Sequence, residues 1–189
     1  ANASSAVERG SGFCGRAARA GAAGGGCVWR VVFAKRQGRR KLHNIAELVA
    51  ACSTWGQGHV ECIAHDFGQG LQASLSVLSA ADVMVATHGA DLINGLAMHA
   101  GATLLEVMPV HQRGCPCDMY RAIFAREGPK VMHYQLSSQN ASYAVSVGPK
   151  AGTYNSDLVV PWQVVQAALS HVLEVGGMPS MYHFRRFRY

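Results

Sequence analysis

Regular alternation between short apolar runs and segments of helical spacing constrains the fold of this chain more than any other feature. Five apolar runs have the length of strands, at residues 27–34, 59–64, 82–87, 103–108 and 131–136. Apolar residues recur at three- and four-residue steps in the segments between and after them, at 42–55, 71–81, 92–99, 119–127 and 161–175. Strands that are apolar throughout are buried on both faces, and alternation with helices makes them parallel. The sequence therefore predicts an α/β fold with a Rossmann-like, doubly wound parallel sheet.

The 189 residues leave room for one such domain, which we place at residues 28–177. Residues 1–27 hold seven of the 21 glycines and almost no large apolar side chains. Such a stretch cannot bury enough surface to offset the entropy lost on ordering, so we expect a disordered, low-complexity linker. Residues 178–189 form a basic, aromatic tail, which we interpret as a disordered end or a divergent terminus. With no initiator methionine and no signal peptide at its start, we expect the chain to be a fragment.

Charge and composition exclude several classes of protein. At 49% hydrophobic and 15% charged residues, the composition is that of a globular protein rather than a disordered one. No apolar run is long enough to predict a membrane span. The net charge of +6 is the sum of +8 over residues 1–41, −5 over residues 42–180 and +3 over the last nine residues. Because the body of the chain is acidic, nucleic-acid binding is disfavoured, and the basic tail alone keeps it as a hypothesis.

Six cysteines are present, at irregular spacings. The pair Cys115 and Cys117 lacks the two-residue gap of a zinc knuckle, so we expect no metal site. A partial set of disulfides in a secretory protein is compatible with this cysteine content. Two Asn-x-Ser sequons, at Asn2 and Asn140, are compatible with that compartment.

Ligands of doubly wound sheets bind at the carboxyl ends of the strands, which here selects the turns at residues 34–41, 87–91 and 106–109. In the second turn, Gly89 would let the backbone approach a phosphate at a helix start, where free N–H groups favour an anion. His88 would donate to a phosphoryl oxygen or carry a proton. The alternatives are a tight-turn role for Gly89, a buried and satisfied polar role for His88, and an N-cap role for Asp91.

The first turn carries five cations between Lys35 and Lys41, and arginine offers a planar fork for phosphate oxygens. The cluster is either a diphosphate clamp or a solvated loop. Near the third turn, Glu106 interrupts an otherwise apolar strand, where burial of an unpaired carboxylate is costly. Contact with ribose hydroxyls would explain this residue, and so would a salt bridge to Arg36 or Arg40.

Three common signatures are missing: Gly-x-Gly-x-x-Gly, the P-loop and Gly-x-Ser-x-Gly. Their absence disfavours a dinucleotide dehydrogenase, a P-loop protein and an α/β-hydrolase. What remains is a nucleotide- or phosphate-binding domain. The run Ala81-Asp-Val-Met-Val-Ala-Thr-His-Gly-Ala-Asp-Leu92, followed by Gly101-Ala-Thr-Leu-Leu-Glu-Val-Met-Pro109, resembles glycosyltransferase family 61. That family shows an apolar strand, a His-Gly-Ala-Gly/Asp-Leu turn, and then a strand with Glu and a nearby Pro.

Further blocks extend this resemblance over roughly residues 28–175. Upstream, Arg36, Arg40 and Asn44 resemble the family's Arg-rich turn and following Asn, and Asp66 to Gln69 resembles a short segment ending in Gln. The Asp91 version of the turn looks most like the branch of the EGF-domain-specific O-GlcNAc transferase. Three more segments resemble that branch, at residues 117–120, 133–134 and 160–173.

The resemblance implies the C-terminal, donor-binding half of a GT-B glycosyltransferase. Such an enzyme transfers GlcNAc, xylose or arabinose with inversion from a UDP-sugar to a hydroxyl of a glycoprotein or glycan. It works in the lumen of the Golgi or endoplasmic reticulum. It uses no metal and no cofactor beyond the donor substrate, because cationic side chains and helix N-termini neutralise the diphosphate. The alternative is an inactive, transferase-like fragment that acts as a binding or interaction module, since the first half of the enzyme is missing.

The same resemblance implies roles for nine residues. The diphosphate is expected at the helix start formed by His88, Gly89 and Ala90. Arg36 and Arg40 would neutralise the leaving UDP, Glu106 would hold the ribose hydroxyls, and Asn44 and Gln69 would make secondary contacts. Asp91 is a candidate for the catalytic base, and His88 is a second catalytic candidate.

Overall fold

A six-stranded, wholly parallel sheet forms the centre of the computed structural model, which describes residues 28–110, 118–125, 130–138, 140–145 and 155–189. The strand order is β2-β1-β3-β4-β5-β8. The bounds are β1 Trp29–Ala34, β2 Val60–His65, β3 Val83–Thr87, β4 Ala102–Val107, β5 Val131–Ser137 and β8 Arg186–Arg188. An order of 2-1-3-4-5 is that of doubly wound nucleotide-binding sheets, so the predicted fold class is confirmed. The linker predicted for residues 1–27 lies outside the described residues.

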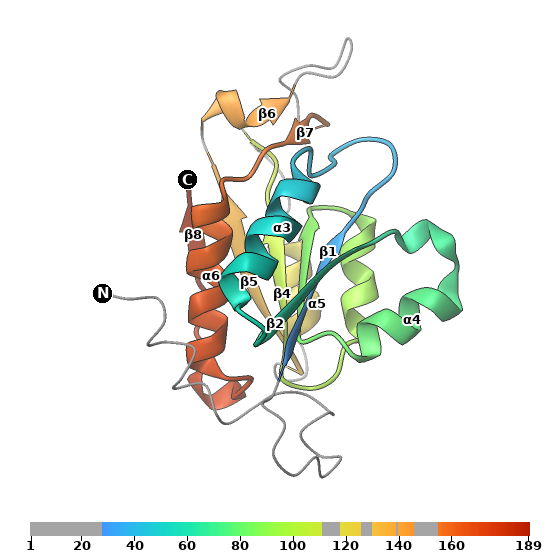
Figure 1. Ribbon diagram of the computed structural model, residues 1–189, viewed down its shortest axis with the longest axis vertical. Coiled ribbons are helices and arrows are strands. Elements are labelled where there is room, and N and C mark those ends of the chain that lie inside the picture. The colour runs from blue at the N-terminus through green and yellow to red at the C-terminus, as the bar shows by residue number, and fades with distance from the viewer. Residues whose placement is uncertain (1–27, 111–117, 126–129, 139, 146–154) are drawn as a thin grey trace.

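Helices cover both faces of this sheet (Figure 1). One face packs against α3, Ile45–Gly56, and α6, Trp162–Val175, in a core that contains Phe33, Leu48 and Leu169. The other face packs against α4, Leu71–Ser79, the 3₁₀ helix η2, Ala90–Ala97, and α5, Met119–Ala125. Buried side chains occur at successive positions along β3 and β4, as expected of strands that bury both faces.

The helix predicted at residues 92–99 is instead the 3₁₀ helix η2, which begins two residues earlier. The Asn94 side-chain amide donates to the Asp91 carbonyl at 3.0 Å, and so competes for an acceptor of the α-helical ladder. At Gly95 a Cβ atom would lie 3.1 Å from the Phe124 ring, so a larger residue would have to push that ring aside. The helical spacing identified this segment, but these local contacts decide its type.

A small antiparallel hairpin, β6 Ala144–Val145 and β7 Asp157–Leu158, was not expected from the sequence. It lies beyond the carboxyl ends of the main strands, near the start of α3 (Figure 1). Leu158 also bridges to Leu42, and the Asp157 carboxylate accepts from the Lys41 N–H at 2.8 Å. Three short 3₁₀ turns complete the described structure: η1 Phe67–Gln69, η3 Ala141–Tyr143 and η5 Pro179–Met181.

The C-terminal tail is part of the fold, so its interpretation as a disordered end is wrong. Residues 186–188 form β8, which pairs in parallel with β5 from Gln135 to Ser137. Phe187 is buried against the sheet and contacts the Tyr134 ring edge to face. The tail is ordered because its aromatic side chains, among them Tyr182 and Phe187, pack against Tyr134 of the sheet.

Helix α3 and strand β2 are joined by a disulfide between Cys52 and Cys62, with the two Cα atoms 6.0 Å apart. The other four cysteines lie outside the described residues. In the described part of the chain, no helix has the length and hydropathy needed to cross a membrane.

Candidate functional site

The candidate site lies where the carboxyl ends of β1 and β3 meet at the centre of the sheet. From β1 the chain moves to β2 on one side, and from β3 it moves to β4 on the other. This reversal lies between the loop after β1, residues 35–44, and the turn after β3, residues 88–91. Doubly wound sheets bind ligands at such a switch point. The structure thus brings together the two turns that the sequence selects.

Arg36 spans these two turns. Its Nη1 donates to the His88 carbonyl at 3.3 Å, and its Nε lies 3.6 Å from Asp91 Oδ2. Gly89 has a φ of 153°, and a Cβ atom there would lie 2.1 Å from Arg36 Nη1. The φ favours glycine at this position, and a methyl group there would displace the guanidinium, which lies directly against the backbone of the turn. The Arg36 guanidinium and the turn at Gly89 are therefore in direct contact.

Asp91 lies in the first turn of η2, and the N-cap of η2 is Gly89, so the N-cap role considered for Asp91 is wrong. Its side chain is 30% exposed and its partner is Arg36, whose side chain is 15% exposed. The carboxylate is thus at the accessible edge of the site, where a proton acceptor for a ligand hydroxyl would have to lie.

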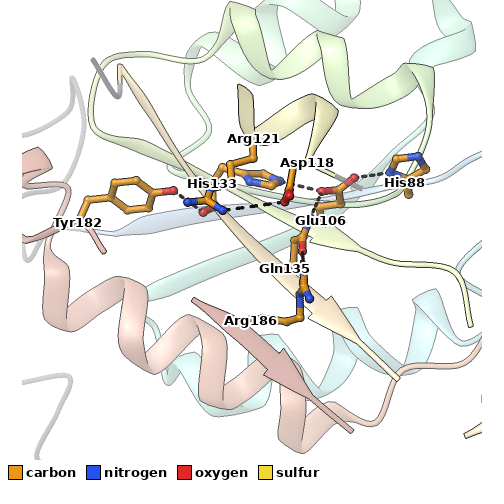
Figure 2. Close-up of polar contacts among 8 residues, drawn as sticks. All are labelled: His88, Glu106, Asp118, Arg121, His133, Gln135, Tyr182 and Arg186. Atoms are coloured by element: carbon orange, nitrogen blue, oxygen red, sulfur yellow. Dashed lines mark hydrogen bonds and ion pairs between the residues drawn. The ribbon is translucent and has the colours of Figure 1, made fainter. Parts of the chain in front are cut away.

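Beneath this edge, Glu106 is fully buried and accepts three hydrogen bonds (Figure 2). His88 Nδ1 lies 2.5 Å from Oε1, His133 Nε2 lies 2.8 Å from Oε2, and Gln135 Nε2 donates to Oε2 at 3.1 Å. Gln135 Oε1 in turn accepts from Arg186 Nε at 2.9 Å and from Nη2 at 2.7 Å. We call these five residues the Glu106 network: His88, Glu106, His133, Gln135 and Arg186.

Electrostatics keep Glu106 ionised in this network. Burial alone would raise the pKa of the carboxyl, but the hydrogen bonds from His133 and His88 outweigh it, and the pKa lies below its usual 4.5. An ionised carboxylate only accepts, so the facing ring nitrogens carry protons. His88 is thereby fixed with a proton on Nδ1, the arrangement in which a buried acid orients a histidine.

Both interpretations of Glu106 made from the sequence differ from what the structure shows. Glu106 has no exposed surface for a ribose, and its described partners are two histidines and a glutamine rather than Arg36 or Arg40. The ring of His88 is also buried, with its side chain 4% exposed, and packs edge to face on Tyr120. In this conformation His88 presents its backbone carbonyl, not its ring, to Arg36.

The other residues proposed for the site lie at the same edge with differing access. Ala90 and Gln69 are exposed, Gln69 at the end of η1 beyond β2. Both ends of the Asn44 amide bond to the connection between β7 and α6: Nδ2 donates to the Val160 carbonyl at 3.0 Å, and Oδ1 accepts from the Val160 N–H at 3.2 Å. Arg40 is buried and adopts a left-handed backbone conformation, with a φ of 60°.

Two members of the Glu106 network, Gln135 and Arg186, were not among the residues proposed from the sequence, and His133 was noted only as part of a resemblance. Polar residues at alternate positions of an apolar strand, His133 and Gln135, were the available signal. Among the described residues, no group of three or more His, Cys, Asp or Glu has a geometry that would hold a metal ion.

Fold and site together define an α/β domain that presents a cation and a glycine turn at the ligand-binding edge of a doubly wound sheet. Comparison with known proteins narrows this class. The model of the family Glycosyltransferase 61 matches residues 22–105, which include Arg36, His88 and Gly89 and end one residue before Glu106. This match supports a glycosyltransferase of family 61.

Two curated relatives are rice proteins, from Oryza sativa subsp. japonica. The chain is 26% identical over 123 residues to beta-1,2-xylosyltransferase XYXT1, covering 65% of this chain and 26% of that protein. It is 31% identical over 80 residues to beta-1,2-xylosyltransferase XAX1, covering 42% of this chain and 14% of that protein. The matched region thus spans about a quarter or less of the length of these relatives.

Proposed function

We propose that this chain is the nucleotide-sugar-binding domain of an inverting family 61 glycosyltransferase, with the diphosphate of a UDP-sugar bound at the turn after β3. The observation that carries the proposal is the position of Arg36 directly over Gly89 at the switch point of the sheet. A phosphate there would meet the guanidinium and the backbone N–H groups at the start of η2.

Binding is favourable in this proposal because Arg36 exchanges the Asp91 carboxylate for the diphosphate. The contact between Arg36 and Asp91 is long, at 3.6 Å, and partly exposed, so it contributes little to stability. A diphosphate carries more charge than one carboxylate and accepts in the fork geometry that arginine prefers. Exposed Lys35 and Arg39 in the same loop would add to the attraction.

Asp91, released from Arg36, is the proposed base. It would take the proton from the acceptor hydroxyl while that oxygen bonds to the anomeric carbon of the sugar and the bond to the UDP phosphate oxygen breaks. Arg36, and Arg40 if its side chain reaches the phosphate, would stabilise the charge on the leaving UDP. Direct attack opposite the leaving group inverts the anomeric centre.

Xylose is the sugar we favour among xylose, GlcNAc and arabinose, because both rice relatives carry beta-1,2-xylosyltransferase in their names. The acceptor we propose is a glycan or glycoprotein hydroxyl in the secretory pathway, where a disulfide such as Cys52–Cys62 persists. Two parts of the resemblance stay predictions: that this domain is one half of a GT-B enzyme, and that it belongs to the branch of the EGF-domain-specific O-GlcNAc transferase.

Calorimetric titration of the purified chain with UDP tests donor binding. We expect Arg36→Ala to weaken binding at least about tenfold, the loss of one charge-assisted contact. The matched control is Arg39→Ala, which removes an exposed arginine from the same loop. Absence of binding at millimolar UDP by the folded chain would contradict the proposal, as would equal losses in the two variants.

An assay of transfer separates an enzyme from a binding module. Incubation with UDP-xylose, UDP-GlcNAc or UDP-arabinose and glycan acceptors should release UDP, and xylose should be preferred. A chain that binds UDP but releases none from any donor would act as the interaction module that we consider as the alternative. The interaction module is compatible with the comparison, because the match covers 26% of the length of XYXT1.

A further inference from the structure

The Glu106 network crosses the sheet at a single level. Strand pairing places Ala86, Glu106, Gln135 and Arg186 side by side on β3, β4, β5 and β8. His88 follows two residues after Ala86, and its carbonyl accepts from Arg36. Figure 2 shows the series of contacts from Arg186 through Gln135 and Glu106 to His88. The contact between Arg36 and the His88 carbonyl extends it to the candidate site.

Arg186 determines which way the Gln135 amide faces. Both of its donors, Nε and Nη2, point at Gln135 Oε1, at 2.9 and 2.7 Å. With the oxygen held there, the amide nitrogen must face Glu106, where it donates to Oε2. If the amide were reversed, its oxygen would face the carboxylate and its N–H groups would face the guanidinium, and both contacts would be repulsive.

His133 is held by the same C-terminal segment. The Tyr182 hydroxyl donates to the His133 carbonyl at 2.7 Å, and the His133 ring stacks between Phe124 and Phe184. Arg121 covers the outer face of Phe184, with its guanidinium carbon 4.2 Å from the ring centroid. Within the described residues, Nδ1 of His133 has no hydrogen-bond partner, so the bond to Glu106 is the one polar anchor of this ring.

The geometry points to Arg186 as a remote positioning residue for donor binding: it orients Gln135, which with His133 fixes Glu106, which holds His88 and the turn against which Arg36 lies. This inference rests on the proposed function and adds to it a role for the C-terminal strand. Arg186 touches neither the turn nor Arg36, so its effect passes through Gln135 and Glu106.

Arg186→Ala should weaken UDP binding by roughly two- to tenfold, the range in which packed networks couple distant positions. Arg186→Lys should weaken UDP binding to a similar degree, because an ammonium does not supply the planar pair of donors that faces the Gln135 amide oxygen. The matched control is Arg188→Ala, which removes the other exposed arginine of the same strand, one that does not bond to Gln135. Thermal melts of all three variants verify that β8 stays folded.

A double-mutant cycle distinguishes positioning from a general loss of charge. Gln135→Ala alone should weaken UDP binding, and adding Arg186→Ala should then cost nothing further, because the amide through which Arg186 acts is gone. Additive losses would overturn the inference, and so would Arg186→Ala binding like wild type. If Arg186→Ala and Arg188→Ala weakened binding equally, net charge would explain the result and the inference would fail.

Nuclear magnetic resonance of the histidine rings provides a readout that does not depend on UDP. The ring nitrogen signals of His88 should show one fixed tautomer, with the proton on Nδ1, in the wild-type chain. In Arg186→Ala these signals should shift or broaden, and in Arg188→Ala they should not. Unchanged His88 signals in Arg186→Ala would overturn the inference even if the wild-type chain bound no UDP, a result that counts separately against the proposed function.

Discussion

Replacing Glu106 by glutamine tests the network at its centre, because the change removes the charge and keeps the shape. The carboxylate accepts three hydrogen bonds and is fully buried. Bonds to an ionised acceptor contribute about 2 kcal/mol each, roughly twice a neutral bond. Three such bonds reduced to neutral strength give an expected loss of about 3 kcal/mol in the free energy of unfolding. The amide nitrogen would face a histidine ring that must change tautomer to accept from it.

The loss should depend on pH in a defined direction. The pKa of Glu106 is lowered in the folded state, so its stabilising contribution is complete above the unfolded value near 4.5 and is lost as the pH falls through the folded value. The difference in stability between wild type and Glu106→Gln should therefore be constant from pH 7 down to about pH 4.5. Below that pH it should shrink, because the wild-type carboxyl becomes neutral as well.

Urea denaturation followed by circular dichroism, at several pH values, measures this difference. The matched control is Glu47→Gln, which neutralises an exposed glutamate in the first turn of α3 and should change stability by less than about 1 kcal/mol. A loss below about 1 kcal/mol in Glu106→Gln at pH 7, or a difference that grows on acidification, would refute the reasoning. Either result would mean that Glu106 does not hold the charged, hydrogen-bonded state that its burial and partners imply.

Three further predictions concern the turn, the disulfide and the compartment. Gly89→Ala should weaken UDP binding at least about tenfold in calorimetry, because its methyl group would displace Arg36, and it should destabilise the fold by about 1–3 kcal/mol; binding at wild-type affinity would contradict this. Removing the Cys52–Cys62 disulfide, which joins residues separated by 10 positions, should cost about 3 kcal/mol in urea denaturation, and the double alanine variant should be insensitive to reductant. Asn140 is exposed in a turn, and in secreted protein it should carry a glycan whose removal by peptide N-glycosidase changes gel mobility; a mobility shared with Asn140→Gln would count against the secretory assignment.

The main sheet and its α-helices could be predicted from the sequence because their signals are local. Runs such as Val83–Thr87 are apolar at each position, and helices such as Trp162–Val175 repeat their apolar residues over several turns. Strand β8 and the β6–β7 hairpin gave no comparable signal. They are two or three residues long, and their stability comes from partners distant in sequence, as when Leu158 pairs with Leu42.

In the candidate site, too, some residues could be predicted from the sequence and others could not. Placement of Arg36, Gly89 and Asp91 at one edge followed from a general rule about strand ends, and the structure brings these three together. The partners of Glu106 could not be derived, because they depend on strand order: Gln135 lies opposite Glu106 only once β5 is known to pair with β4 in that register. An acidic residue in an apolar run signalled a special role without revealing which side chains satisfy it.

The balance of charges gives a second reason to expect that Arg186 affects the proposed binding of a diphosphate. A buried, ionised carboxylate one level below the turn would by itself repel an incoming diphosphate, and the low dielectric of the interior would strengthen that repulsion. Arg186, which is exposed, places one positive charge at the end of the Glu106 network through Gln135, and Arg36 faces Asp91 at the surface. Exposed Lys35 and Arg39 then add positive charge at the edge. If the site binds a diphosphate as proposed, we expect this binding to weaken when Arg186 is removed.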